Sequence, residues 1–154
     1  MMPERLQRCK KFSMANRDLF GAYVSTCFVV DAPSRAIRLR IGKPNPEADR
    51  LLSECDVTTA AFITAWNPGS VLLSEAENKR RQQSMEREIQ YAGFRFLRGR
   101  GEGIDPAWTA EESILIFGIS KPDAIAIADR FGQLAIVWHE RGQASALVPV
   151  PDGL

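Results

Sequence analysis

The sequence predicts an α/β domain, bordering on α+β, with a single mixed β-sheet of about seven strands and three or four helices. Short apolar and β-branched runs recur along the chain, and amphipathic segments with capping residues lie between them. The length of 154 residues suits one domain, and 45% hydrophobic with 25% charged residues is an ordinary globular composition. We therefore expect one domain over residues 1–154, with loose tails at 1–12 and 149–154.

The first half of the chain predicts a hairpin, a short helix and a buried strand. Residues 23–30 are rich in β-branched and aromatic side chains, residues 36–41 alternate apolar residues with arginine, and a proline-containing turn separates them. Asn45 followed by Pro46 is typical of a helix start, and predicts a helix to about residue 55. The nearly continuous apolar run 59–66 indicates a strand covered on both faces.

The second half repeats this alternation. Ser74 with Glu77 forms a capping box and Gly93 is a suitable helix terminator, so we expect a long helix over 75–92. The elements that follow are a strand at 94–97, a glycine-rich loop at 99–103, a strand at 112–118, a helix from Ser120 to Gly132, and a hairpin of strands 134–138 and 144–148.

The predicted element order is therefore ββα-βα-ββα-ββ. Helical crossovers make strands 36–41, 59–66 and 94–97 run in the same direction. The link 98–111 has no helical pattern, so strand 112–118 should return antiparallel, which makes the sheet mixed.

Charge and composition narrow the function classes. The formal net charge of +1 gives no overall attraction to nucleic acid, although the N-terminal segment is locally basic. Three cysteines without a CxxC spacing indicate free thiols in a cytoplasmic, reducing compartment, and one histidine argues against a metal site. No apolar run approaches the ~18 residues of a membrane helix, so we expect no membrane association.

Polar side chains from separate segments should meet at one edge of the sheet. Strand 59–66 delivers Asn67 there, the antiparallel strand 112–118 begins there with Glu111 and Glu112, and Gln133 precedes strand 134–138 at the same edge. Ligands of open α/β sheets bind at such an edge.

The long helix adds two polar residues to this cluster. Its apolar stripe, which contains Met85 and Ile89, continues at helical spacing to Arg81 and Asn78. Polar groups on a core-facing stripe need partners, which would be a glutamate or a ligand. The helix N-terminus also suits an anion.

Each candidate has a structural interpretation as well. Asn67 before proline is typical of an Asx-turn, Ser70 is a loop serine with no neighbouring base, and Gln133 is placed to satisfy a helix end. Arg81 more readily forms an ion pair with a glutamate than an anion site. Glu111 and Glu112 are adjacent on a strand, so they should point to opposite faces.

The chain resembles a bacterial family known as domain of unknown function 3293. The resemblance lies in Ala61-Phe-Ile-Thr-Ala-Trp-Asn-Pro-Gly-Ser70, Glu111-Glu-Ser113, Arg130-Phe-Gly-Gln133 and Ala135-Ile-Val-Trp138, within a span from about Leu19 to Val148. The resemblance implies one domain over most of the chain, and it implies no activity, cofactor or catalytic residue.

Three functions remain open. The first is a pocket at the sheet edge for an anionic small molecule such as a nucleotide or phosphate ester, bound by Asn67, Ser70, Asn78, Arg81 and Gln133, with Glu111 or Glu112 as catalytic base. The second, weighed equally, is a non-catalytic module that binds a protein partner. The third is an enzyme acting on nucleic acid. Neither a cofactor nor the oligomeric state follows from the sequence.

Overall fold

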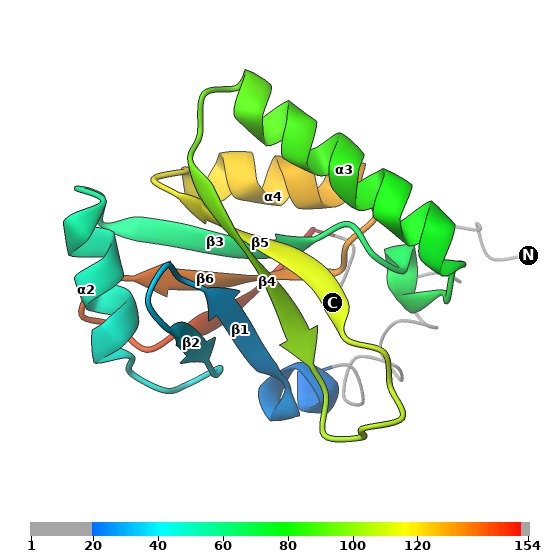
Figure 1. Cartoon of the computed structure of the whole chain (residues 1–154), viewed down its shortest axis with the longest axis horizontal. Helices are drawn as coiled ribbons and strands as arrows, with labels where there is room; N and C mark the ends of the chain where they lie inside the picture. Colours follow the sequence, from blue (N-terminus) through cyan, green and yellow to red (C-terminus); the bar gives the residue numbers. More distant parts are fainter. Residues whose placement is uncertain (1–19, 152–154) are drawn as a thin grey trace, which may run out of the picture.

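The computed structural model describes residues 20–151, in which seven strands form one sheet in the order β2-β1-β4-β5-β3-β6-β7 (Figure 1). The strands are β1 (Cys27–Asp31), β2 (Ala36–Leu39), β3 (Thr59–Thr64), β4 (Phe96–Glu102), β5 (Glu111–Phe117), β6 (Ala135–Glu140) and β7 (Ala146–Pro149). The helices are α2 (Pro46–Glu54), α3 (Glu75–Tyr91) and α4 (Lys121–Arg130), with a 3-10 turn η1 (Pro68–Ser70).

The predicted fold class and element order are confirmed. Strands β2, β3 and β4 run in the same direction, and β5 returns antiparallel, as the connections require. The neighbours differ from the expected ones, because β5 pairs with β4 as a hairpin and also with β3, and thus separates these two strands. All ladders between the named strands are therefore antiparallel, and the parallel pairing is an isolated bridge between Ile41 and Ser145.

The helices begin at the residues that the sequence marks. The side-chain oxygens of Asn45, Ser74 and Ser120 each accept a hydrogen bond from the backbone N–H three residues later. The long helix ends before Gly93, whose φ of 86° lies in the left-handed region.

Each face of the sheet has its own core. Helices α3 and α4 cover one face of the sheet (Figure 1). On this face Met85 and Ile89 pack with Ile114, Ile116 and other apolar side chains. Helix α2 covers part of the other face, where Leu51 and Leu52 pack against Phe62, Leu115 and their neighbours. The second face extends beyond α2 toward the end of β3, which is the end that delivers Asn67.

A buried histidine on β6, His139, forms a hydrogen bond with helix α2. The Nε2 atom of His139 lies 2.8 Å from Oδ1 of Asp49 on α2, and its Nδ1 atom lies 2.9 Å from Oγ of Ser145. His139 and Ser145 are each 1% exposed, so neither side chain is accessible to a substrate.

Three segments differ from the sequence-based boundaries. Residues 20–25 are helical, so the first strand begins only at Cys27. Most of the glycine-rich stretch 99–103 belongs to β4, because Gly99 lies so close to Val29 that a Cβ atom would meet the Val29 carbonyl oxygen at 2.1 Å. Pro149 ends β7, and the Val150 N–H donates to the Leu134 carbonyl, so these two residues are not a loose tail. The other predicted tail, 1–12, lies outside the described residues.

Between residues 20 and 151, the structure contains no helix that is long and apolar enough to cross a membrane.

Candidate functional site

Asn67 is the centre of a hydrogen-bond network at the end of β3. Its backbone has φ 46° and ψ 63°, a left-handed conformation that asparagine tolerates better than most residues. Its Oδ1 atom accepts from the Leu73 N–H at 3.0 Å and from Nδ2 of Asn78 at 2.9 Å. The Asx-turn interpretation is thus wrong, because the Gly69 N–H donates to the Gly132 carbonyl instead.

The network extends to Glu111, the first residue of β5. Nδ2 of Asn67 donates to Oε1 of Glu111 at 2.8 Å. Burial raises the pKa of the Glu111 carboxyl above its ordinary value, and the hydrogen bond from Asn67 opposes this by favouring the charged form. Burial and the nearby Glu111 charge also raise the pKa of Tyr23 to about 12. Glu111 and Tyr23 therefore share a poorly solvated environment.

These residues face a pocket of about 410 Å³ on the second face of the sheet, beyond the part that α2 covers. Phe28, Phe62 and Val137 form its floor, and they come from β1, β3 and β6. The helical segment 20–25 and the loop that follows β4 supply further walls, including Tyr23 and Trp108. The polar side chains at the pocket belong to Tyr23, Ser25, Thr26, Thr64, Asn67, Ser70, Asp105, Glu111 and Ser113.

Charge in this lining is negative. Glu111 and Asp105 line the pocket, and among the described lining residues there is no lysine or arginine. Oε1 of Glu111 accepts a hydrogen bond from Asn67, whereas Oε2 has no hydrogen-bond partner within residues 20–151. The pocket thus offers a hydrogen-bond acceptor that no described part of the chain occupies.

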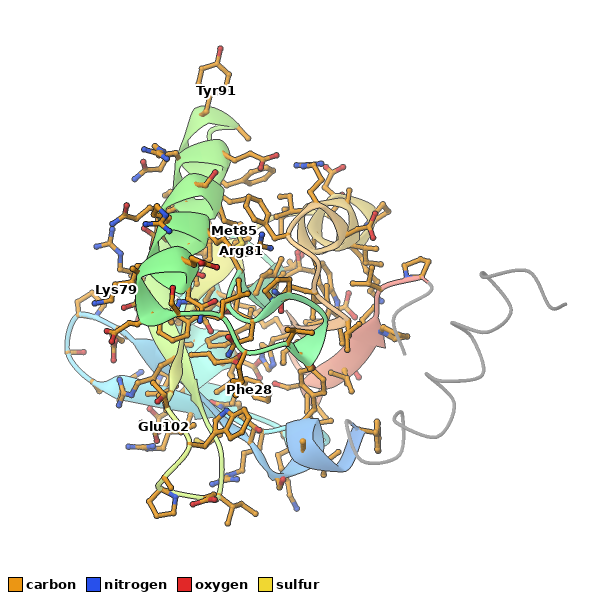
Figure 2. All side chains as sticks on the ribbon, turned by 90° about the vertical axis from the view of Figure 1, so that its right-hand side faces the viewer. Phe28, Lys79, Arg81, Met85, Tyr91 and Glu102 are labelled. Carbon is orange, nitrogen blue, oxygen red and sulfur yellow. The ribbon has the colours of Figure 1, made fainter. Side chains whose placement is uncertain are left out.

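Arg81 and Gln133 lie near the network but do not line the pocket. Arg81 donates from Nε to the Ala65 carbonyl at 3.0 Å and from Nη2 to the Phe131 carbonyl at 2.5 Å. Figure 2 shows Arg81 and Met85 on the inner side of α3, with Lys79 on the outer side. Gln133 donates to the Trp66 and Phe131 carbonyls at 3.0 and 3.2 Å.

The expected ion pair of Arg81 with a glutamate is therefore wrong. No carboxylate of the described chain lies within 4.0 Å of its guanidinium, and the end of α4 provides carbonyl oxygens in place of a carboxylate. Arg81 holds this end of α4 against the end of β3. Gly132, just after α4, also packs closely against Pro68, just after β3. A Cβ atom at Gly132 would lie 2.7 Å from Cβ of Pro68.

Glu111 and Glu112 are neighbours on β5, so their side chains point to opposite faces of the sheet. Glu111 lines the pocket, whereas Glu112 is exposed and does not line it. Ser70 lines the pocket with a left-handed φ of 62°, and Asn78, 2% exposed, lies behind Asn67. No group of three or more histidine, cysteine, aspartate or glutamate side chains in the described part is arranged to hold a metal ion.

Sequence reasoning missed Tyr23 because its aromatic and β-branched neighbours predict a strand where the structure has a helical segment. It missed Trp108 and Asp105 because they lie in a connecting segment whose path over the sheet has no local sequence signal. Exposed apolar side chains at these segments are an additional feature of the site. Leu72, Ile104 and Trp108 line the pocket with 67%, 78% and 54% of their surface exposed, and Phe20, Val24 and Val71 are exposed in the adjoining chain.

Residues 63–136 match the family described as Protein of unknown function (DUF3293). The match covers a little under half of the chain and supports membership in this family. The matched segment of the DUF3293 family contains Asn67, Asn78, Trp108 and Glu111, and its upstream limit excludes Tyr23 and Phe28. No curated protein and no solved structure gives a significant match to the chain.

Proposed function

We propose that this protein binds a small organic molecule in the pocket beside Glu111. The observation that carries the proposal is the pocket itself, which has a largely apolar wall and a few convergent polar groups. Cavities of roughly 300–1,000 Å³ with this composition are the usual sites of small-molecule binding.

The lining favours a different ligand from the nucleotide or phosphate ester that the sequence suggested. An anion placed beside Glu111 and Asp105 would be repelled, and Arg81, the expected anion-binding residue, donates to two backbone carbonyls. A ligand with an apolar body and a hydrogen-bond donor directed at Glu111 is complementary to this pocket.

Glu111 is also the residue that would carry any chemistry. A carboxyl group whose pKa is raised by burial exchanges a proton closer to neutral pH than an ordinary glutamate does. A reaction in this pocket would accordingly be a proton transfer to or from the ligand, with Asn67 positioning the carboxyl group. Glu112 is exposed outside the pocket and would take no part in this proton transfer.

A second candidate function is the binding of a protein partner. The observation in its favour is the set of exposed apolar side chains around the pocket, which includes Phe20, Val24 and Val71 outside the lining. In this alternative a side chain of the partner would enter the pocket, and free small molecules would bind weakly or not at all.

The test of small-molecule binding uses one-ring aromatic fragments of positive, zero and negative charge, followed by chemical-shift changes of the protein amides. Ala22 lines the pocket mouth and is exposed, so Ala22→Trp should block it at little cost to folding. Ala126→Trp, on the exposed face of α4, is the matched control. We expect at least one fragment to bind the wild type and the control but not Ala22→Trp. If none binds in this pattern, the proposed function is contradicted.

We also propose that the protein comes from a bacterium and is located in the cytoplasm. Free thiols at Cys27 and Cys55 support a reducing compartment, and the family resemblance supports a bacterial source.

A further inference from the structure

The pocket combines two carboxylates with aromatic rings from several segments. Phe28 and Phe62 lie on its floor with ring centroids 5.5 Å apart at an interplanar angle of 68°. Tyr23 and Trp108 line it from the helical segment and from the loop after β4. The faces of aromatic rings carry a negative potential, so the rings and the carboxylates both attract cations.

We infer that the pocket selects organic ammonium ions, with the charged nitrogen beside Glu111 and the carbon body against the aromatic rings. This inference rests on the proposed function, because it specifies the chemical class of the ligand that the same pocket would bind. It reverses the sign of charge that the sequence alone suggested.

The hydrogen bonds of Glu111 support a cation in particular. One carboxylate oxygen is held by Asn67, and the other has no partner in the described chain. No arginine, lysine or histidine of residues 20–151 forms an ion pair with this carboxylate. A half-buried carboxylate without a counter-charge is unfavourable, and an ammonium ligand would supply both the missing charge and the missing donor.

The apolar wall supports an organic cation over a hydrated inorganic one. Phe28, Phe62, Val137 and Ala135 offer no oxygen ligands for a metal ion, and they are complementary to a carbon skeleton. Stacking on Trp108 and Tyr23 would add cation–π attraction that a neutral ligand of the same shape does not experience.

Three probes with the same ring and different head groups test the inference: benzylamine, benzyl alcohol and benzoate. We expect benzylamine to bind wild-type protein at least about tenfold more tightly than benzyl alcohol, since a charged hydrogen bond of this kind contributes roughly that factor. Benzoate should bind most weakly. The measurement is an amide chemical-shift titration at pH 7 and low salt.

Two matched variants assign the selectivity to one carboxylate. Glu111→Gln keeps the size of the side chain and an oxygen that accepts from Asn67, but it removes the charge. It should lose the preference for benzylamine and retain the affinity for benzyl alcohol. Glu112→Gln is the same substitution at the adjacent, exposed position and should leave all affinities unchanged. An amide spectrum of each variant checks that it is folded.

The outcomes separate this inference from the proposed function. If benzyl alcohol or benzoate binds as tightly as benzylamine and Ala22→Trp abolishes binding, the pocket is a ligand site and the inference of an ammonium ligand is wrong. The same conclusion follows if Glu111→Gln retains the preference for benzylamine. If none of the three probes binds, the proposed function fails and the inference fails with it.

Discussion

Asn67 and Asn78 are joined by two hydrogen bonds of opposite direction. The backbone N–H of Asn67 donates to Oδ1 of Asn78 at 2.8 Å, and Nδ2 of Asn78 donates to Oδ1 of Asn67 at 2.9 Å. This pair fixes the left-handed backbone at Asn67 and aims its amide group at Glu111. The geometry of the pocket carboxyl therefore depends on a residue of α3 that does not itself line the pocket.

Replacing Asn78 should loosen the whole network. Asn78→Ala removes both bonds to Asn67 and leaves buried polar groups without partners, at an expected cost of about 2–4 kcal/mol in the free energy of unfolding. For a domain of this size the melting temperature should fall by roughly 5–10 °C. Gln83→Ala, at an exposed position of the same helix, should change little. Equal stabilities of the two variants would show that the network contributes nothing to the fold.

Arg81 should behave as a structural residue. Arg81→Ala strands the carbonyls of Ala65 and Phe131, and we expect it to cost about 3 kcal/mol. Arg80→Ala, exposed on α3, is the control. Low millimolar phosphate should shift the melting temperatures of wild type and Arg81→Ala equally. The opposite result would support an anion site at Arg81: Arg81→Ala would stay stable and would lose a phosphate-induced rise in melting temperature that the wild type shows.

Glu111 makes stability depend on pH in a predictable direction. Because burial raises its pKa in the folded state, the folded protein holds this proton more tightly than the unfolded chain does. The contribution of Glu111 to stability is fully present below the unfolded pKa of about 4.5 and is lost as pH rises through the folded pKa.

Glu111→Gln should accordingly be more stable than the wild type at pH 7, and the difference should shrink as pH falls toward 4. Urea unfolding at a series of pH values measures this difference, with Glu112→Gln as the matched substitution. A Glu111→Gln protein that is less stable than the wild type at neutral pH would contradict a burial penalty on this carboxylate.

The two glycines at the ends of the glycine-rich stretch should differ sharply. Gly99→Ala places a methyl group 2.1 Å from the Val29 carbonyl oxygen and 3.2 Å from the Phe62 ring, so we expect a loss of about 3 kcal/mol. Gly103→Ala meets nothing within 4 Å and should be neutral. The comparison uses thermal unfolding, and a stable Gly99→Ala protein would mean that β1 and β4 separate easily.

The edge where polar groups meet could be predicted because strand direction follows from the connections. Crossover helices set the directions of β3 and β4, and the absence of a helix before β5 set its return, which brought Glu111 to the same end as Asn67. Alternation along β5 then separated Glu111 from Glu112. These inferences needed only local signals.

The hydrogen-bond partners of Arg81, and the contribution of Tyr23 and Trp108 to the pocket wall, could not be predicted in this way. A helical stripe indicates that Arg81 faces inward, but the choice between a carboxylate and a carbonyl depends on where α4 ends relative to β3. Tyr23 reaches the pocket from a helical segment where the sequence predicts a strand, and Trp108 reaches it from the irregular loop after β4. The composition of residues 99–103 suggests a loop, although Gly99 is required by the close approach of β1.

The order of the strands also determines how the domain must fold. Hairpins β1–β2, β4–β5 and β6–β7 can form locally, but the ladders β1–β4, β3–β5 and β3–β6 join segments far apart in the sequence. Sheets dominated by such non-local pairing close slowly, because loop entropy is lost before the contacts that offset it have formed. Phe28, Val137 and Glu111 come from three different hairpins, so the pocket is complete only when all three hairpins have come together. A ligand that binds there would hold the three hairpins together in the folded state, and should slow unfolding far more than it speeds folding.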